Sequence, residues 1–294
     1  MLSRFVLGTV QLGKPYGRRR AYPLMSEAHA FRILDAAWGA GVRAFDTAEA
    51  YGASAARLRA WSEARGNAGE LEVVTKCAVD FGGRAPATIE DSAHAALTRF
   101  DTAGSVVLLT HGAVGADAWG VVKSVANKFG AGAGQSVYAP EEVSDACSLP
   151  GAVRVQAPGN VLDRRAIAAR GESSVSLDIR SVYLQGVLLD PPEIAGRRAP
   201  GASGIARTVQ AAAAALGVEL APLLVAGVLA SLRKDDRVVL GVDDATQLEV
   251  LRPALEMGEA TVREFEAAIG HLTDEAATRL VLDPRQWPTV GVVG

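Results

Sequence analysis

Cysteine is nearly absent from this chain of 294 residues, which contains only Cys77 and Cys147. Two cysteines cannot build a disulfide framework, and their spacing matches no metal-binding motif. The sequence therefore predicts no metal site, and a reducing cytoplasm is the simplest location for the protein.

Charge of one sign and long apolar runs are also scarce. The chain has 30 Lys and Arg against 33 Asp and Glu, a formal net charge of -3, which does not favour nucleic acid or an anionic membrane. The longest apolar stretch, residues 220–232, is too short to span a bilayer and is predicted to be a buried helix. The N-terminus lacks the apolar core and cleavage site of a signal peptide. We expect a small-molecule partner, no nucleic acid and no membrane, and a monomer or a small homo-oligomer.

Short apolar runs alternate with longer amphipathic runs along the whole chain. The short runs are rich in Val, Leu and Ile and mostly lack period-two alternation, which is typical of strands buried on both faces. The predicted strands lie near residue 5 and at 42–47, 71–76, 105–110, 134–138, 153–158, 176–184 and 237–242. Eight such units favour a closed barrel over an open sheet. We therefore predict an α/β fold, a (β/α)8 TIM barrel, that forms a single domain over residues 1–294.

Helical patterns lie between these strands. Ser26 is a plausible N-cap for a helix over 26–41 that stops at a glycine, Gly41. Similar patterns occupy 87–100, 117–130 and 244–257, and the Ala-rich tract 210–217 is also predicted to be helical. The stretch 190–204, rich in Pro, Gly and Arg, follows the seventh strand and is predicted to be an active-site loop.

Ionisable side chains recur where successive strands end. Asp46 ends the second predicted strand and Lys76 ends the third. His111 follows the fourth, and Tyr51 lies five residues beyond Asp46. Because the carboxyl ends of barrel strands share one face, where barrel active sites are built, these four side chains are expected to meet.

This set of side chains suits proton exchange with a carbonyl oxygen. A phenol has a pKa of about 10, and a nearby lysine ammonium lowers it. A buried lysine needs a counter-charge, which Asp46 would supply for Lys76. His111 could donate a hydrogen bond that orients a substrate carbonyl. The set therefore predicts a reaction in which charge develops on a carbonyl oxygen while another group delivers hydride.

Each of the four residues has a plainer interpretation when it is taken alone. A strand-terminal aspartate is often a helix N-cap, and a lysine at a strand end is often solvated. A single histidine or tyrosine is more often structural or packed in a core. The coincidence of all four at matching strand ends favours the catalytic interpretation.

At these residues the chain resembles the aldo-keto reductase superfamily. The segments FDTAEAYG (45–52), VVTKC (73–77) and LLTHGA (108–113) match its motifs, and LGTVQLGKPYG (7–17) resembles its first strand and loop. GQSVYAPEEV, VQAPGNVLDRR, RSVYLQGVLL and VVLGVDDATQLEVL resemble the fifth to eighth strands of a bacterial subgroup similar to sugar- and polysaccharide-associated members.

The resemblance implies a nicotinamide cofactor, NADPH by family default or NADH, and Tyr51 as general acid/base. Lys76 and Asp46 would tune Tyr51, and His111 would orient the carbonyl. Cofactor binding is implied for Thr9, Asp46, Ser136, Gln156, Arg180, Ser181, Leu184, Gly186, Gly241, Asp243 and Gln247. Substrate contact is expected from Tyr16, Arg18 and Trp119, and also from Arg19, Arg20, Arg197 and Arg198.

The chain departs from the family pattern around the cofactor. Asp243 stands where Lys or Arg often reads the 2′-phosphate of NADP, and a carboxylate there would repel a phosphate. Arg180 stands where an aromatic ring usually stacks on the nicotinamide, a role that a guanidinium plane can take. Val137 and Leu251 each replace a frequent asparagine.

Together these features predict an NAD(P)-dependent oxidoreductase that interconverts a carbonyl and an alcohol, with a sugar-like substrate. One alternative keeps Tyr51 and Lys76 for a redox-neutral lyase, dehydratase or epimerase. The other is a non-catalytic binding protein of the same fold.

Overall fold

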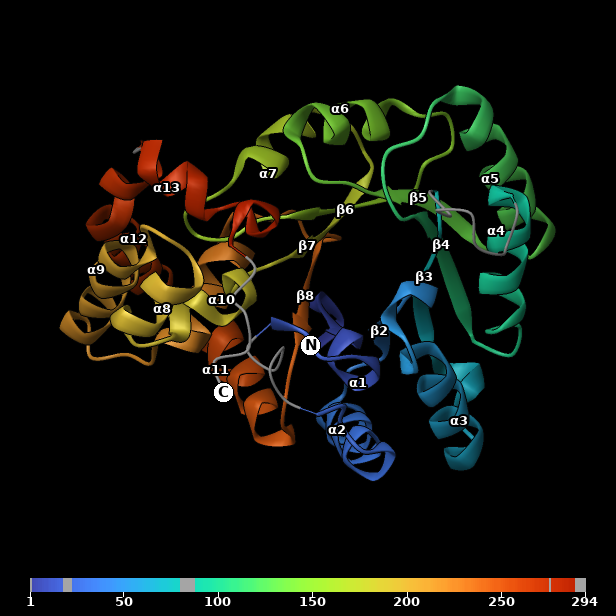
Figure 1. The fold of residues 1–294 in the computed structure, drawn as a ribbon, viewed down its shortest axis with the longest axis horizontal. Helices are drawn as coiled ribbons and strands as arrows, with labels where there is room; N and C mark the ends of the chain where they lie inside the picture. Colours follow the sequence, from blue (N-terminus) through green and yellow to red (C-terminus); the bar gives the residue numbers. More distant parts are fainter. Residues whose placement is uncertain (1, 18–22, 80–87, 275, 289–294) are drawn as a thin grey trace. The chain divides into compact units, whose positions relative to one another are not determined.

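The computed structural model describes residues 2–17, 23–79, 88–274 and 276–288. Eight parallel strands follow one another in chain order, and the pairing of β1 with β8 closes them into a barrel (Figure 1). The strands are β1 Phe5–Gly8, β2 Ala44–Asp46, β3 Glu72–Cys77, β4 Ser105–Thr110, β5 Gly132–Ser136, β6 Arg154–Pro158, β7 Ser176–Arg180 and β8 Arg237–Gly241. The predicted (β/α)8 barrel is thereby confirmed.

The chain divides into two compact units. Unit 1 comprises Met1–Pro158, Ala166–Arg180 and Arg233–Leu248, and it contains all eight strands of the barrel. Unit 2 comprises Gly159–Arg165, Ser181–Leu232 and Glu249–Gly294. The organisation of residues 1–294 as a single domain stays a prediction.

Three strands differ in extent from the sequence prediction. β2 begins at Ala44, two residues later than expected. β5 begins at Gly132, two residues earlier than expected, and β7 ends at Arg180, well before residue 184. β7 ends there because Ser181 has a φ of 66°, outside the extended region that a strand requires. The carboxyl ends of the other strands lie within one residue of their predicted positions.

The helix predicted over 26–41 begins and ends where the sequence carries capping signals. The Ser26 hydroxyl accepts a hydrogen bond from His29 N, and Gly41 ends the same helix in the left-handed conformation with a φ of 99°. The helices of unit 1 are α1 Val10–Gly13, α2 Glu27–Ala40, α3 Ser54–Arg65, α4 Ile89–Thr98, α5 Ala116–Lys128 and α6 Pro140–Ser148, with the 3₁₀ turns η1 Leu2–Arg4, η3 Glu49–Tyr51 and η4 Ala68–Glu70. α7 Arg165–Ala169 and η6 Ala245–Val250 each cross a boundary between the units.

An apolar layer joins α4 and α5 to strands β3, β4 and β5. Cys77 of β3 is fully buried in it against Leu97 of α4 and Val122 of α5. Burial raises the pKa of the Cys77 thiol to about 12, so this side chain acts as a small hydrophobic residue. Trp119 of α5 belongs to the same layer, which fixes the outward face of these strands.

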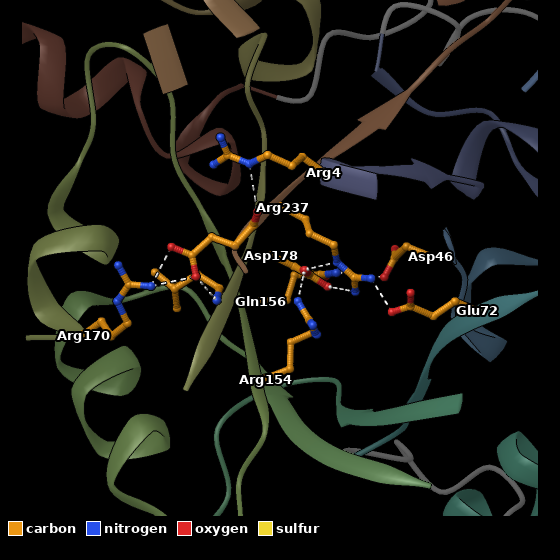
Figure 2. A network of polar contacts seen from close by, with 10 residues as sticks. Arg4, Asp46, Glu72, Arg154, Gln156, Arg170, Asp178 and Arg237 are labelled. Atoms are coloured by element: carbon orange, nitrogen blue, oxygen red, sulfur yellow. Dashed lines mark hydrogen bonds and ion pairs between the residues drawn. The ribbon is translucent and has the colours of Figure 1, made fainter. Parts of the chain in front are cut away.

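A network of ion pairs joins the strands at the end of the barrel where they begin. Asp178, in the middle of β7 and fully buried, accepts from Arg237 Nε at 2.9 Å and from Arg154 Nη1 at 2.7 Å (Figure 2). Arg237 also pairs with Glu72. Glu72, Arg154 and Arg237 are the first residues of β3, β6 and β8, so the network lies at the end of the barrel opposite the predicted active site.

Unit 2 is built from helices in its described part. They are η5 Leu184–Leu189, α8 Pro192–Arg198, α9 Ala202–Ala215, α10 Leu220–Ala230, α11 Leu251–Glu256, α12 Glu259–Ile269, η7 Gly270–Asp274, α13 Ala276–Val281 and η8 Pro284–Gln286. α10 is mostly buried and packs against α11 and α12, as predicted for residues 220–232. The stretch 190–204 is mainly helical, so its prediction as a loop is wrong; Pro192 at the start of α8 is compatible with a first helical turn.

A membrane-spanning helix was not expected from the sequence. In the described ranges, no single helix is both long and apolar enough to cross a membrane. α9 and α10 reach that length and composition only as a pair bent by 95°.

Backbone strain is concentrated just after β7. Ser181, Leu184 and Gln185 have φ values of 66°, 51° and 54°, and they are the non-glycine residues with positive φ in the described part of the chain. Gly186 continues the same segment with a φ of 90°. Such conformations are costly and cluster at ligand-binding segments, so residues 181–186 are a candidate binding segment of unit 2.

Candidate active site

A buried ion pair forms the base of the site. Lys76 Nζ, at the end of β3, lies 2.5 Å from Asp46 Oδ2, at the end of β2, and its side chain has no exposed surface. Lys76 also donates to the Thr47 carbonyl at 3.2 Å. The carboxylate of Asp46 therefore serves Lys76 rather than a helix N-terminus, and Lys76 is not a solvated strand end.

Asp46 is positioned by the strand beside it. Thr9 donates to the Asp46 carbonyl twice, from its backbone N at 2.9 Å and from its hydroxyl at 2.8 Å. The Thr9 hydroxyl also accepts from Ser54 at 2.5 Å, and Thr9 has no exposed surface. The hydrogen bonds of Thr9 thus hold Asp46, and its expected contact with the cofactor stays a prediction.

Two amide and hydroxyl side chains extend this network across the barrel. Gln156 Nε2 donates to Asp46 Oδ2 at 2.8 Å, and Ser136 Oγ donates to Gln156 Oε1 at 3.1 Å. Ser136 and Gln156 are register partners at the ends of β5 and β6. The structure thus brings both predicted carboxamide-binding residues to the ion pair, where each could exchange its present partner for a ligand amide.

Tyr51 and His111 lie above the pair. Lys76 Nζ is 5.1 Å from the centroid of the Tyr51 ring, and the ring of His111 meets that of Tyr51 edge-on at a centroid distance of 5.9 Å. His111 is anchored through its backbone N, which donates to the Cys77 carbonyl at 2.9 Å. All four predicted catalytic side chains are therefore brought together.

A close backbone approach sets the position of Tyr51. A Cβ atom on Gly13, at the end of α1, would lie 2.0 Å from the Tyr51 carbonyl oxygen and 2.2 Å from Ser54 N. Only glycine allows α1 to pack this tightly against η3. The segment that follows β1 therefore fixes the height of the phenol over the ion pair.

The pKa of the Tyr51 phenol is raised, whereas the sequence predicted that it would be lowered. Burial, and then the negative charge of Asp46, raise the pKa of Tyr51 above its ordinary value, and Arg180 opposes this effect. The charge of Lys76, which lies 2.5 Å from Asp46 Oδ2, is compensated and does not outweigh these effects. In this state Tyr51 keeps its proton near neutral pH, which suits a proton donor.

The pKa values of Lys76 and His111 are both lower than their ordinary values. Burial lowers the pKa of Lys76, while Asp46 opposes that effect. Partial desolvation, followed by the charges of Lys76, Arg180 and Lys14, lowers the pKa of His111 to about 4. His111 is therefore a neutral imidazole near pH 7, with one N–H to donate.

Arg180 and Tyr138 join the site in a way that the sequence did not indicate. The Arg180 guanidinium lies 4.0 Å over the centroid of the Tyr138 ring and donates to the Val137 carbonyl at 3.1 Å. Lys14, also unforeseen, lies in the loop after β1 and donates to the Ala50 carbonyl at 3.1 Å. The only available signal was their position just after strand ends.

The end of β8 carries features suited to a ligand. A Cβ atom on Gly241 would lie 2.4 Å from Gln11 Oε1, which is buried and lacks a hydrogen-bond partner among the described residues. Asp243 N donates to Gln247 Oε1 at 2.7 Å, which fixes the turn that follows. An orphaned acceptor beside a close-packed glycine fits a bound polar group, as expected of a cofactor site.

The remaining predicted residues fall into three groups. Ser181, Leu184 and Gly186 belong to the strained segment of unit 2. Tyr16 is half-buried in the loop after α1 of unit 1, whereas Arg18, Arg19 and Arg20 lie outside the described residues. Arg198 of unit 2 pairs with Asp190 and donates to the Gln185 carbonyl at 2.7 Å, so its charge is already used.

The expectation that Trp119 contacts substrate is wrong. Its side chain lies in the apolar layer behind β3 to β5, with 3% of its surface exposed, and its indole donates to the Pro150 carbonyl at 3.3 Å. Trp119 is on the inward face of α5, which the sequence alone did not orient. Among the described residues, no group of three or more His, Cys, Asp or Glu side chains is placed to hold a metal ion.

Residues 4–113 match the aldo/keto reductase family. This segment contains Asp46, Tyr51, Lys76 and His111, so the resemblance seen in the motifs is confirmed. No curated protein sequence matches the chain. The matched family and the barrel together support an oxidoreductase.

Solved structures share the fold at low sequence identity. A glycerol dehydrogenase from Gluconobacter oxydans is 14% identical, with a TM-score of 0.72 and 93% of each chain covered. A thermostable aldo-keto reductase solved with the inhibitor epalrestat is 16% identical, with a TM-score of 0.63, and the match covers 90% of this chain and 94% of the other. These likenesses show the architecture of the chain.

Proposed function

We propose that this chain is an NAD(P)-dependent aldo-keto reductase that interconverts a carbonyl and an alcohol, with a sugar or sugar-like compound as substrate. The observation that carries the proposal is the buried Lys76–Asp46 pair beneath the Tyr51 ring, with His111 edge-on to the phenol. A proton donor, its charge support and a carbonyl-orienting group are then present at one barrel mouth.

The cofactor would be held by residues from several strand ends. Ser136 and Gln156 would bind the carboxamide, and Arg180 would lie against the nicotinamide ring. In unit 1, Gly241, Asp243 and Gln247 would bind the adenosine end. For Ser181, Leu184 and Gly186, which belong to unit 2, contact with the pyrophosphate stays a separate prediction. A reduced nicotinamide, when bound, would supply hydride to the carbonyl carbon. The carboxylate of Asp243 favours NADH, because it would repel the 2′-phosphate of NADPH.

The protein residues would manage the proton. Tyr51, whose pKa is raised by burial, would donate its hydroxyl proton to the carbonyl oxygen as negative charge develops there. The Lys76 ammonium, 5.1 Å from the ring, would stabilise the phenolate that remains. The neutral imidazole of His111 would donate a hydrogen bond to the same oxygen, which aligns the carbonyl before the proton moves.

The redox-neutral alternative is less well supported. A lyase or epimerase would use Tyr51 as a base, and a base must lose its proton first. Burial and Asp46 both oppose formation of the phenolate in this arrangement. Solvent-deuterium incorporation into a carbonyl substrate without any cofactor would favour that alternative.

A titration tests the proposal most directly. The purified protein is mixed with increasing NADPH, then separately with NADH, while cofactor fluorescence is followed. Binding at sub-millimolar concentration, followed by cofactor oxidation when sugar-like aldehydes are added, is the expected result. Failure of both cofactors to bind would overturn the proposal.

A further inference from the structure

We propose that Arg180 forms an anion subsite beside Tyr51 and His111, so that the preferred substrate is a carbonyl compound carrying a carboxylate. This inference rests on the proposed carbonyl–alcohol function and specifies its substrate class. It concerns residues of unit 1 alone.

The Arg180 guanidinium is held in place by β5 and the segment after it. Its plane stacks over the Tyr138 ring at 4.0 Å, and Nη2 donates to the Val137 carbonyl at 3.1 Å. Stacking on a ring and one hydrogen bond leave the rest of the planar fork of N–H donors directed elsewhere. Arg180 is also half-buried, so a bound anion would be partly shielded from water.

Arg180 differs from the other arginines at the barrel strands in its lack of a counter-ion. Arg154 of β6 and Arg237 of β8 both pair with Asp178. Within the described ranges, no carboxylate lies within ion-pairing distance of Arg180, which donates to the Val137 carbonyl.

Glu142, an acidic residue soon after β5, already binds backbone groups. Glu142 Oε2 accepts from Tyr138 N and from Ala139 N, each at 2.8 Å, and so caps the start of α6. Its geometry therefore serves the backbone and does not neutralise the stacked guanidinium. Since the described residues supply no carboxylate that pairs with Arg180, we assign its negative partner to a ligand.

The surrounding charges point the same way. Arg180 and Lys14 both act on His111, and Asp46, the carboxylate of the cluster, is bound to Lys76 at 2.5 Å. Among Asp46, Lys76, Arg180 and Lys14, the cations therefore outnumber the carboxylate. A guanidinium fork matches the two oxygens of a carboxylate, and the pair is strengthened where water is partly removed.

A role against the nicotinamide ring would use the face of Arg180, whereas a carboxylate would bind at its edge. These two roles can coexist, but substitution of Arg180 should weaken the binding of different ligands in each case. Loss of ring stacking weakens cofactor binding for every substrate. Loss of the anion subsite weakens only charged substrates, mainly through KM.

The test compares 4-carboxybenzaldehyde with its uncharged analogue 4-formylbenzamide, using the whole chain and saturating cofactor. The wild-type protein should prefer the carboxylate by roughly ten- to hundredfold in kcat/KM, the range of one charge-assisted hydrogen-bonded contact. Arg180→Met should remove most of this preference through a higher KM, and Arg180→Lys should restore part of it. Arg59→Met, which changes an exposed arginine of α3, is the matched control and should keep the preference.

Two outcomes would overturn the anion subsite. One is an unchanged preference in Arg180→Met. The other is a weaker cofactor affinity in Arg180→Met with equal losses for both aldehydes, which would make Arg180 a nicotinamide partner only.

A cofactor-free arm separates this inference from the proposed function. Calorimetric titration with benzoate and with benzamide measures the subsite even if neither aldehyde is reduced. Binding of benzoate that weakens roughly tenfold or more in Arg180→Met supports the subsite whatever the fate of the reductase. Equal binding of benzoate by both proteins, or none by either, contradicts it.

Discussion

Lys76 Nζ and Asp46 Oδ2 lie 2.5 Å apart inside the barrel, with 0% and 4% of their side-chain surfaces exposed. Each charge is tolerated because the other is present, so removal of either partner leaves an unpaired charge in a place that water cannot reach. We expect Lys76→Met and Asp46→Asn each to lower the free energy of unfolding by about 3–5 kcal/mol.

The double variant provides the control for that prediction. Because it removes both charges, its loss should be well below the sum of the two single losses in denaturant unfolding. Arg59→Met, at an exposed pair on α3, should change the unfolding free energy little. Additive losses in the double variant would show that the two groups do not support each other.

Tyr51→Phe isolates the proton transfer. The ring contacts with Lys76 and His111 are retained by phenylalanine, whereas the hydroxyl proton is lost. Turnover should fall by about 10²–10⁴-fold, the usual contribution of a general acid, with cofactor affinity nearly unchanged. Steady-state rates and a fluorescence titration of cofactor measure the two quantities, and undiminished turnover would remove Tyr51 from the mechanism.

Gly13→Ala should damage the site without touching a reacting group. The added methyl would lie 2.0 Å from the Tyr51 carbonyl, so η3 must move and carry the phenol away from Lys76. We expect a large loss of turnover and a loss of about 1–3 kcal/mol in the free energy of unfolding.

Gly120→Ala is the matched control for that substitution. Gly120 lies on the exposed face of α5, and an added Cβ meets nothing within 4 Å. The change should keep turnover and raise the unfolding free energy by about 0.4–1 kcal/mol, since alanine restricts the unfolded chain. Equal effects of the two substitutions on turnover would mean that Gly13 does not position Tyr51.

The lowered pKa of His111 predicts how the unfolding free energy depends on pH. Its pKa is about 4 in the folded protein against an ordinary value of 6.5, so the unfolded chain binds more protons between these values. The unfolding free energy should therefore fall as the pH is lowered from 6.5 towards 4, and the contribution of His111 should be constant above that window. His111→Gln should lose less stability over the same window; identical pH profiles for both proteins would contradict the lowered pKa.

Asp243 should govern the choice between the two cofactors. Asp243→Arg replaces a repelling carboxylate by a cation and should shift the ratio of dissociation constants toward NADPH by about tenfold. Asp244→Arg, at the exposed neighbour that pairs with His29 at 3.6 Å, makes the same charge change and should shift the ratio less. Equal shifts in both variants would mean that Asp243 does not face the ribose.

The barrel and the four candidate catalytic residues could be predicted because both depend on short, local sequence patterns. Buried parallel strands are apolar runs, and a strand end fixes the face on which a following side chain lies. Asp46, Lys76 and His111 needed only that rule and the order of the strands.

The contacts that the sequence did not reveal join residues far apart in the chain. Asp46 binds Gln156 across 110 positions, and Arg237 binds Glu72 across 165. Asp178 was detectable only as a charge in the middle of an apolar strand. The pKa of Tyr51 depends on its burial and on the charges of Asp46 and Arg180 near it, an arrangement that no sequence pattern specifies.

Because Cys77 is buried, the rate at which a thiol reagent labels it measures local opening of the barrel. A thiol reagent attacks the thiolate, and the Cys77 thiol is both fully covered and raised in pKa to about 12. Modification at this position must therefore wait until α4 and α5 separate from β3, so its rate follows the local opening equilibrium. Because Cys77 adjoins Lys76, a ligand that tightens the ion pair should slow that rate, and mass spectrometry of the modified peptide can follow occupancy of the site without any turnover.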